Sequence, residues 1–318
     1  MHLALSTHWN GGRHRNGEAV IEEILELGFD RVELGYDLTM DLVAGVRSRI
    51  LDGSVGVDSV HAYCPVPVGA PAGHPELYSL AARDSRLRAL AVRHMEDTVR
   101  FAAEAGARVV VAHAGRVAMR SAADKLGRWL AEGKENESCY EKLKLKTMMR
   151  RDRKRGRHLD ALHASLDELM PTLEESRVTL ALENLPEWET MPTEVEALDI
   201  LDRYVDGPIR LWHDVGHARI REAFGFACAE QWRKRTASGI VGVHLHESDG
   251  VRDVHRFPLR EETVVSALKS LRPFDTFFVF EPAPGTEPAA LRESLALFRR
   301  LFAEQARSED HGTGVGVV

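Results

Sequence analysis

Residues 209–217 read Ile-Arg-Leu-Trp-His-Asp-Val-Gly-His, a short apolar run that ends on an imidazole and a carboxylate. Similar runs, separated by longer amphipathic stretches, recur along the whole chain. This alternation is typical of parallel strands joined by crossover helices. Eight candidate strands can be counted: Leu3–Ser6, Arg31–Leu34, Val57–His61, Arg108–His113, Thr179–Glu183, Ile209–His213, Ile240–His246 and Thr276–Glu281.

Helical patterns lie between these strands, and most of them end near a glycine or another turn residue. The clearest are Ala19–Leu27, Ser85–Ala105, Thr193–Tyr204 and Ala289–Phe302. A chain of 318 residues accommodates eight such strand-helix units with an insertion. We therefore predict an α/β fold, a single (β/α)8 TIM barrel over residues 1–307.

Three segments interrupt the alternation. A proline- and glycine-rich loop, 64–76, follows the third strand. A helical insertion at about 118–176 separates the fourth and fifth strands and contains a basic segment, 142–157, with nine Lys or Arg in sixteen positions. We interpret this segment as a solvated helix or lid, with binding of a phosphate-bearing ligand as the alternative. Residues 308–318, rich in glycine and polar residues, are predicted to be a disordered tail.

Composition narrows the class of protein. The chain is 44% hydrophobic and 29% charged, and no apolar run approaches the roughly 18 residues of a membrane helix. A net charge of -7 argues against a surface coated with positive charge for nucleic acid. Cys64, Cys139 and Cys228 are far apart, so neither a disulfide framework nor a zinc knuckle is indicated. Without a signal-peptide pattern at the N-terminus, we predict a cytoplasmic protein.

Carboxylates and imidazoles stand at the ends of most predicted strands. In a (β/α)8 barrel these ends meet at the rim that carries the active site. Burying unpaired charges there costs several kcal/mol, which a bound cation would offset. Oxygen and nitrogen donors without cysteine suit Mn, Mg, Co, Fe or Zn. The residues are Glu33, His61, His113, Glu183, His213, Asp214, His244, His246 and Glu281.

Four of these strand ends resemble the metal-ligand motifs of the xylose isomerase-like TIM barrel superfamily, in order along the chain. The motifs are Ala181-Leu-Glu183-Asn184, His213-Asp214-Val-Gly-His217-Ala218, Val243-His244-Leu-His246-Glu247 and Val279-Phe-Glu281-Pro282. The resemblance covers essentially the whole barrel. It implies a divalent metal held by Glu183, Asp214, either His244 or His246, and Glu281.

The superfamily includes ketohexose epimerases, in which two metal-bound glutamates exchange protons with the substrate. This resemblance implies that Glu183 and Glu281 are the catalytic pair of a metal-dependent isomerase or epimerase acting on a sugar, sugar phosphate or related polyol. Glu189 and Arg252 correspond to its substrate contacts, an alignment that makes His246 the ligand.

Two residues near these motifs are further candidates for substrate contacts. The resemblance implies that His217 contacts the substrate or a second metal. The indole of Trp188 either stacks on a sugar ring or base or caps the barrel mouth. His244 and His246 share one face of a strand, so the sequence leaves the choice of ligand between them open. The implied partner is a small carbohydrate-like molecule, and no oligomeric state is indicated.

The superfamily also includes endonuclease IV, which holds three zinc ions with nine side chains. Every one has a counterpart here, so the resemblance implies one to three ions. The alternative function is therefore a multi-zinc phosphodiesterase acting on abasic DNA or another phosphate ester. Leu-Pro-Glu-Trp after Asn184 and Arg-Phe-Pro-Leu after His255 replace the glycine-rich continuations of endonuclease IV, which disfavours this alternative. The nine counterparts are His61, His113, Glu183, Asp214, His217, His244, Asp253, His255 and Glu281.

Overall fold

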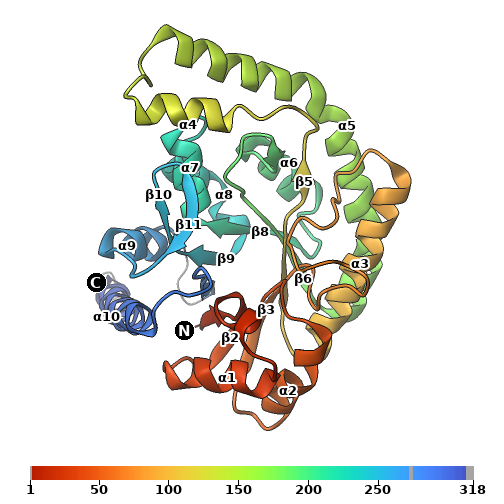
Figure 1. Ribbon diagram of the computed structural model, residues 1–318, viewed down its shortest axis with the longest axis vertical. Coiled ribbons are helices and arrows are strands. Elements are labelled where there is room, and N and C mark those ends of the chain that lie inside the picture. The colour runs from red at the N-terminus through yellow and green to blue at the C-terminus, as the bar shows by residue number, and fades with distance from the viewer. Residues whose placement is uncertain (1, 272–274, 313–318) are drawn as a thin grey trace, which may run out of the picture.

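Eight parallel strands close into a barrel in the computed structural model, which describes residues 2–271 and 275–312 (Figure 1). The order around the barrel is β1-β12-β9-β8-β6-β4-β3-β2. The predicted (β/α)8 barrel is confirmed, and each of the eight predicted strands forms. Their bounds are β1 His2–Ser6, β2 Arg31–Leu34, β3 Gly56–His61, β4 Val109–Ala112, β6 Thr179–Glu183, β8 Ile209–Asp214, β9 Ile240–Leu245 and β12 Phe277–Phe280.

Helices surround the barrel and cover its outer face with a continuous apolar core. Each helix buries one face, as α1 does with Val20, Ile21 and Ile24. The helices are α1 Gly17–Glu26, α2 Met40–Leu51, α3 Ser85–Glu104, α4 Ala123–Ala131, α5 Ser138–Ser176, α6 Glu194–Arg203, α7 Val215–Ala223, α8 Ala229–Thr236, α9 Glu261–Ser270 and α10 Pro288–Gly312. In residues 2–271 and 275–312, no helix is long and apolar enough to cross a membrane.

The predicted insertion forms α4 and α5. The second half of α5 packs beside α3, whereas α4 and the first half of α5 extend past one end of the barrel (Figure 1). A small apolar cluster that includes Leu126, Tyr140 and Phe224 attaches this extension to the region after α7. The basic segment 142–157 lies on α5, and most of its side chains are exposed. Thr147 and Arg151 are the exceptions, with 5% and 2% of their surface exposed.

Two small antiparallel sheets of two strands each lie outside the barrel. β5 Gly115–Arg116 pairs with β7 Thr190–Met191, which joins the segments that follow β4 and β6. β10 Glu247–Asp249 and β11 Arg252–Arg256 form a hairpin directly after β9. Both small sheets therefore stand at the carboxyl end of the barrel strands. At the C-terminus, α10 extends to Gly312, five residues into the predicted tail, and 313–318 lie outside the described residues.

Candidate metal centre

An apolar layer inside the barrel forms the floor of the candidate site. Side chains alternate along a strand, so Ala181 and Glu183 face the barrel interior together, as do Trp212 and Asp214. A Cβ on Gly242 would lie 1.9 Å from the Trp212 ring, so only glycine leaves room for this indole. The ligands thus stand one layer above a packed apolar core. That layer comprises Ala4, Val109, Val111, Ala181, Trp212, Phe277 and Val279.

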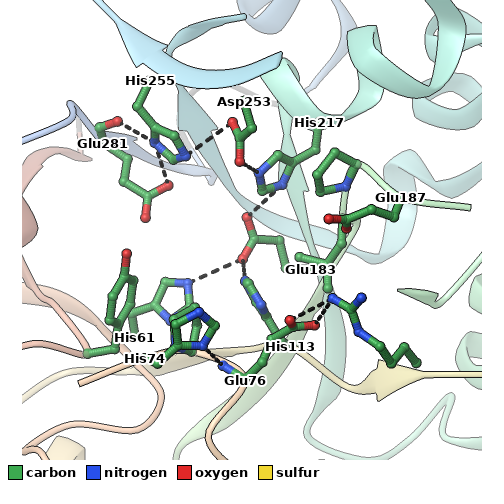
Figure 2. A pocket seen from close by; sticks show the side chains of 15 residues that line it. His61, His74, Glu76, His113, Glu183, Glu187, His217, Asp253, His255 and Glu281 are labelled. Atoms are coloured by element: carbon green, nitrogen blue, oxygen red, sulfur yellow. Dashed lines mark hydrogen bonds and ion pairs between the residues drawn. The ribbon is translucent and has the colours of Figure 1, made fainter. Parts of the chain in front are cut away.

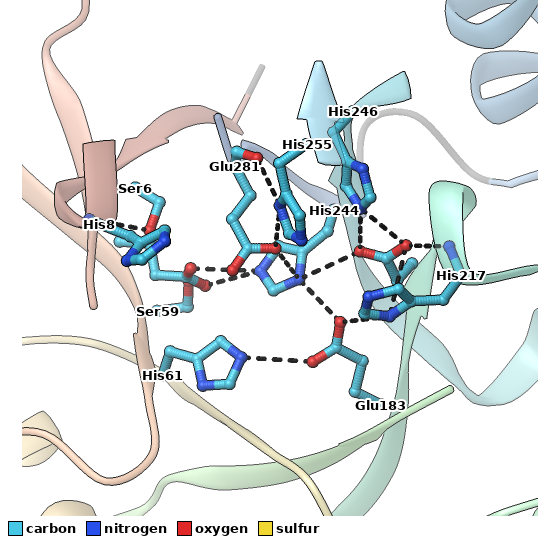
Figure 3. Close-up of polar contacts among 12 residues, drawn as sticks. Ser6, His8, Ser59, His61, Glu183, His217, His244, His246, His255 and Glu281 are labelled. Atoms are coloured by element: carbon cyan, nitrogen blue, oxygen red, sulfur yellow. Dashed lines mark hydrogen bonds and ion pairs between the residues drawn. The ribbon is translucent and has the colours of Figure 1, made fainter. Parts of the chain in front are cut away.

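Three carboxylates converge on one imidazole nitrogen. Nδ1 of His244 lies 3.1 Å from Oε1 of Glu183, 3.2 Å from Oε2 of Glu281 and 3.8 Å from Oδ2 of Asp214 (Figure 3). One donor atom from each of these four residues lies within 4.8 Å of the others. All four residues are at most 3% exposed. This central group can hold a divalent cation with three oxygen ligands and one nitrogen ligand.

Glu33 contacts the opposite nitrogen of the same ring. Both carboxylate oxygens lie 3.2 Å from Nε2 of His244, and the Ser59 hydroxyl donates to Glu33 at 2.7 Å. A carboxylate on the outer nitrogen of a metal-ligating histidine fixes the tautomer and the orientation of the ring. Sequence position alone identifies Glu33 as a strand-end carboxylate but assigns it no role, because its partner lies on a strand more than 200 residues away.

Glu183 also joins the central group to a second group of ligands. Its Oε2 lies 3.3 Å from Nε2 of His61 and 3.1 Å from Nε2 of His113, while its Oε1 faces His244. The two oxygens therefore point toward two different sets of imidazoles (Figure 2). This arrangement suits a carboxylate that bridges two cations.

A third group gathers around the β10–β11 hairpin. Nε2 of His217 lies 3.0 Å from Asp253, and Nε2 of His255 lies 3.3 Å from the same carboxylate. His246 stacks on His255 at 3.8 Å, and its Nε2 lies 2.8 Å from Asp214. Donor atoms of His217, His246, Asp253 and His255 all lie within 4.8 Å of one another.

The structure brings both candidate histidines of β9 into the centre. His244 belongs to the central group, and His246 belongs to the third group. Both are fully buried, as their shared strand face predicts. His244 lies nearest Glu33, Glu183 and Glu281, whereas His246 lies nearest Asp214, so the two histidines occupy different positions in the centre.

Charge in the central group is not balanced by basic side chains. Glu33, Glu183, Asp214 and Glu281 are buried, and no Lys or Arg in the described part of the chain forms an ion pair with any of them. Their partners are imidazoles. Nδ1 of His246, which is fully buried, has no hydrogen-bond partner. Such a donor set fits divalent cations, which would neutralise carboxylates that imidazoles alone leave in excess.

Carboxylates and imidazoles in the centre shift each other's pKa values. Burial alone would raise the pKa of Glu183, but the surrounding histidines, above all His244, hold it well below its usual range. Burial would lower the pKa values of His217 and His244, yet nearby carboxylates raise both well above the usual value. Against the same effect of burial, Glu281 and Asp253 raise the pKa of His255 to about 9. Without a metal, protons therefore occupy several of these nitrogens at neutral pH.

A cavity of about 240 Å³ opens above the ligands (Figure 2). Its walls include Tyr36, His74 and Glu187, together with Arg116, which forms an ion pair with Glu76 at 2.6 Å. The loop 64–76 thus contributes side chains to the cavity, although the sequence indicated only a shaped loop. The polar walls above the candidate metal ligands suit a small hydroxylated or anionic molecule.

Three of the predicted substrate contacts do not line this cavity. Trp188 stacks on Phe226 with ring centroids 5.0 Å apart and lines a different cavity. Arg252 precedes Asp253 on β11 and so faces the opposite side, where it pairs with Asp249. Glu189 is buried but lies outside the cavity wall, which its neighbour Glu187 joins. His217, the fourth, does line the cavity.

Asn184 is a further residue whose role only the structure reveals. Its side-chain oxygen accepts from the backbone N–H of Asp214 at 3.0 Å, and its amide donates to the Asp214 carbonyl at 2.9 Å. This pair of hydrogen bonds fixes the end of β8 against β6. Asn184 directly follows Glu183 in the sequence, but nothing in the sequence indicates that its side chain contacts the backbone of Asp214.

Comparison with known proteins places this arrangement in a family. The model of the xylose isomerase-like TIM barrel family matches residues 21–301. The chain belongs to this family. No curated protein sequence matches the chain.

Solved structures of this family share the fold across the whole chain. An L-ribulose 3-epimerase has a TM-score of 0.68 at 16% identity and covers 99% of this chain and 98% of its own. A D-tagatose 3-epimerase-like protein has a TM-score of 0.65 at 18% identity and covers 96% and 100%. A 3-keto-D-glucoside 4-epimerase from E. coli has a TM-score of 0.63 at 16% identity and covers 94% and 99%. At these identities the likeness is one of fold.

Proposed function

We propose that this family member is a metal-dependent isomerase or epimerase that moves a proton beside the carbonyl of a sugar, sugar phosphate or related polyol. One observation carries the proposal. Glu183, at the end of β6, and Glu281, just after β12, come from strands separated by β8 and β9, and their carboxylates meet at Nδ1 of His244. Two carboxylates that reach one point from different sides of a barrel mouth can exchange protons with a substrate held between them.

The residues divide into holding and proton-transfer roles. Asp214 and His244 hold the metal with Glu183 and Glu281, and the metal, when bound, supplies a Lewis acid that polarises the substrate carbonyl. One glutamate takes the proton from the carbon beside the carbonyl. The other returns a proton to the opposite face for epimerisation. His217 lines the cavity and is the proposed contact to a substrate oxygen or a second metal.

The comparisons support the sugar chemistry without fixing the substrate. Three of the similar structures carry the names of sugar 3- or 4-epimerases. The polar walls formed by His74, Arg116 and Glu187 suit hydroxyl groups or a phosphate. We therefore expect a hydroxylated carbonyl compound, with or without a phosphate.

A second candidate is a multi-metal phosphodiesterase, and the three ligand groups favour it. Glu183 belongs both to the group of His61 and to the central group of His244. Asp214 of the central group contacts His246, which belongs to the group of His255. Two or three cations at such positions can activate water and stabilise a leaving phosphate oxygen. Metal content separates the two candidates, because proton transfer needs only the central cation.

Proton exchange from solvent tests the first candidate. Purified protein in deuterated water should incorporate deuterium beside the carbonyl of at least one member of a panel of ketoses and ketose phosphates. Glu183→Gln and Glu281→Gln should abolish incorporation, whereas Glu104→Gln, an exposed residue paired with Arg47, should leave it unchanged. Absence of exchange across the whole panel would count against the proposal.

Elemental analysis and a phosphodiester assay test the second candidate. Three equivalents of zinc per chain, together with cleavage of an abasic-site oligonucleotide that falls steeply with salt, would favour the phosphodiesterase. One equivalent of metal without cleavage would leave the isomerase as the function.

A further inference from the structure

A second cavity, of about 440 Å³, shares no lining residue with the cavity above the ligands. It lies among the first half of α5, the start of α6, α7, α8 and the loop after β6. We call it the arginine–aromatic cavity and define it by Arg151, Trp188, Arg221, Phe226 and Trp232. Glu187 and Trp188 are adjacent on the loop after β6, so this loop forms a wall of both cavities.

Four nitrogen atoms of residues that line this cavity are buried and have no hydrogen-bond partner. They are Nε of Arg151, Nε1 of Trp188, Nε of Arg221 and Nε1 of Trp232. All four are N–H donors, and no acceptor of a lining residue is unsatisfied in this way. A buried N–H group without an acceptor destabilises the fold. The side chains of the wall therefore hold more donors than acceptors, and a ligand with several oxygen atoms would supply acceptors.

The lining also carries excess positive charge. Three of its four arginines are paired with carboxylates, Arg151 with Glu196, Arg155 with Asp152 and Arg235 with Glu194, so the excess charge is that of Arg221. Arg221 is 3% exposed, and its hydrogen bonds go only to the carbonyls of Pro192 and Glu187 and to the Thr190 hydroxyl. It forms no ion pair with a carboxylate in residues 2–271 or 275–312. Burial, with the nearby positive charge of Arg151, lowers its pKa to about 10, in keeping with an uncompensated guanidinium.

Flat apolar surfaces complete the cavity. The rings of Trp188 and Phe226 are stacked with an interplanar angle of 12°, and the guanidinium of Arg151 lies 5.7 Å from the Trp188 ring centroid. Met148 and Ala227 add further apolar lining. Such walls accept a planar body by stacking.

We propose that the arginine–aromatic cavity binds a small organic anion, with a carboxylate or phosphate group on a flat apolar body. The anionic group lies beside Arg221 and offsets its charge, and small shifts of the wall side chains bring its oxygens to the unsatisfied N–H groups. The planar body lies against Trp188 and Phe226. This site is separate from the metal centre, and binding at it does not depend on the proposed sugar chemistry.

The indole N–H signals of the protein test this proposal directly. The chain has five tryptophans, and each gives one signal in a nitrogen-15 correlation spectrum, assigned by single Trp→Phe variants. Trp188 and Trp232 report on the cavity, whereas Trp212, whose ring centroid lies 5.1 Å from that of His244, reports on the metal centre. The protein is titrated as purified, with its metal, using benzoate, phenyl phosphate, the neutral benzamide and acetate.

Benzoate or phenyl phosphate should shift the Trp188 and Trp232 signals saturably, and the tighter of the two identifies the preferred anionic group. Benzamide should bind at least about tenfold more weakly, because its oxygen carries no charge. Acetate, without a planar body, should bind more weakly than benzoate. Ala227→Phe, which fills the cavity without removing a charge, should abolish the shifts while the Trp212 signal stays in place.

Three outcomes would overturn the proposal. Benzoate and phenyl phosphate could both leave the Trp188 and Trp232 signals unmoved, which would mean that water satisfies the donors. Benzamide could bind as tightly as benzoate, which would make the cavity merely apolar. The shifts could occur only at Trp212, which would place the anion on the metal.

Discussion

Two buried charged networks in this protein are built in opposite ways. Glu196 is paired in bidentate fashion with Arg151, at 2.7 and 2.8 Å, and also accepts from the backbone N–H of Thr193. In the candidate metal centre, Glu183 and Asp214 contact imidazoles, and among the described residues neither carboxylate pairs with a Lys or an Arg. The first network is neutral within the chain. The second becomes neutral only when it binds protons or cations, so we expect mutation of the first to change stability and mutation of the second to change metal binding.

The largest expected effect is the loss of metal from the second network. Asp214→Asn removes a charged ligand that faces both His244 and His246. We expect the metal content to fall by at least one ion per chain and the exchange activity to fall about 10³-fold or more, since the metal stabilises developing charge by several kcal/mol. Elemental analysis and the deuterium-exchange rate measure these effects. His163→Asn, which changes an imidazole on α5 paired with Asp199, is the control and should retain both. Unchanged metal content in Asp214→Asn would refute the ligand assignment.

The first network should respond in stability rather than in metal binding. Arg151→Met leaves Glu196 buried and unpaired, so we expect the free energy of unfolding to fall by about 3–5 kcal/mol in urea titrations. The double variant Arg151→Met, Glu196→Met should recover much of the loss, because neither charge remains. Arg47→Met, which breaks an exposed pair with Glu104, should cost at most about 1 kcal/mol. A double variant as unstable as the single one would show that the pair itself stabilises the fold.

The sequence predicted the barrel because its signals are local. Apolar runs such as Thr179–Glu183 recur eight times, and most of them end on a carboxylate or an imidazole. The pairs β5–β7 and β10–β11 were not predicted, because none of these strands is an apolar run: β5 and β7 have two residues each, and β10 and β11 consist mostly of polar residues. The continuity of α5 was also not evident, since Gly156 and Pro171 lie within the helix and both would indicate a break.

Candidate ligands could be predicted more fully than the contacts around them. Strand position alone brings Glu183 and Glu281 to the same rim. Arg252 points away from the cavity because side chains alternate along β11. This strand belongs to a hairpin that was not predicted from the sequence. Glu33 could not be assigned, because its contact with His244 depends on the closure of the barrel. Local patterns thus predict which residues reach the rim but not which partner each one finds there.

pH should separate the two networks in the metal-free protein. A histidine whose pKa is raised on folding stabilises the fold below its unfolded pKa, near 6.5, and this stabilisation is lost as the pH rises through the folded value. For His255 that value is about 9. Each proton lost changes stability by about 1.36 kcal/mol per pH unit, so chelated protein should lose up to about 3 kcal/mol between pH 6.5 and 9. Metal-loaded protein should not, because the ligands are already deprotonated.

Thermal unfolding with and without a chelator, across pH 6.5 to 9, measures this difference. The gap in Tm between the two forms should widen as the pH rises. Glu196 provides the internal contrast, because Arg151 offsets the effect of burial and lowers its pKa, so its contribution is lost only as the pH falls below the usual glutamate range. A gap that narrows toward pH 9 would contradict the assignment of these histidines as metal ligands.

The smallest effect should come from Glu33, which we regard as a positioning residue. Glu33→Gln keeps the shape of the side chain but weakens the acceptor for Nε2 of His244, so the ring no longer has a fixed tautomer with Nδ1 facing Glu183 and Glu281. We expect metal affinity to fall about 10- to 100-fold, measured by competition with a chromophoric chelator. Ser59→Ala, which removes only the hydrogen bond to Glu33, should have a smaller effect. A merely structural role would lower the Tm of the metal-free protein and leave the affinity unchanged. Because Glu33 has no Lys or Arg partner among the described residues and contacts His244, its charge belongs with the second network, and a loss of affinity would support this assignment.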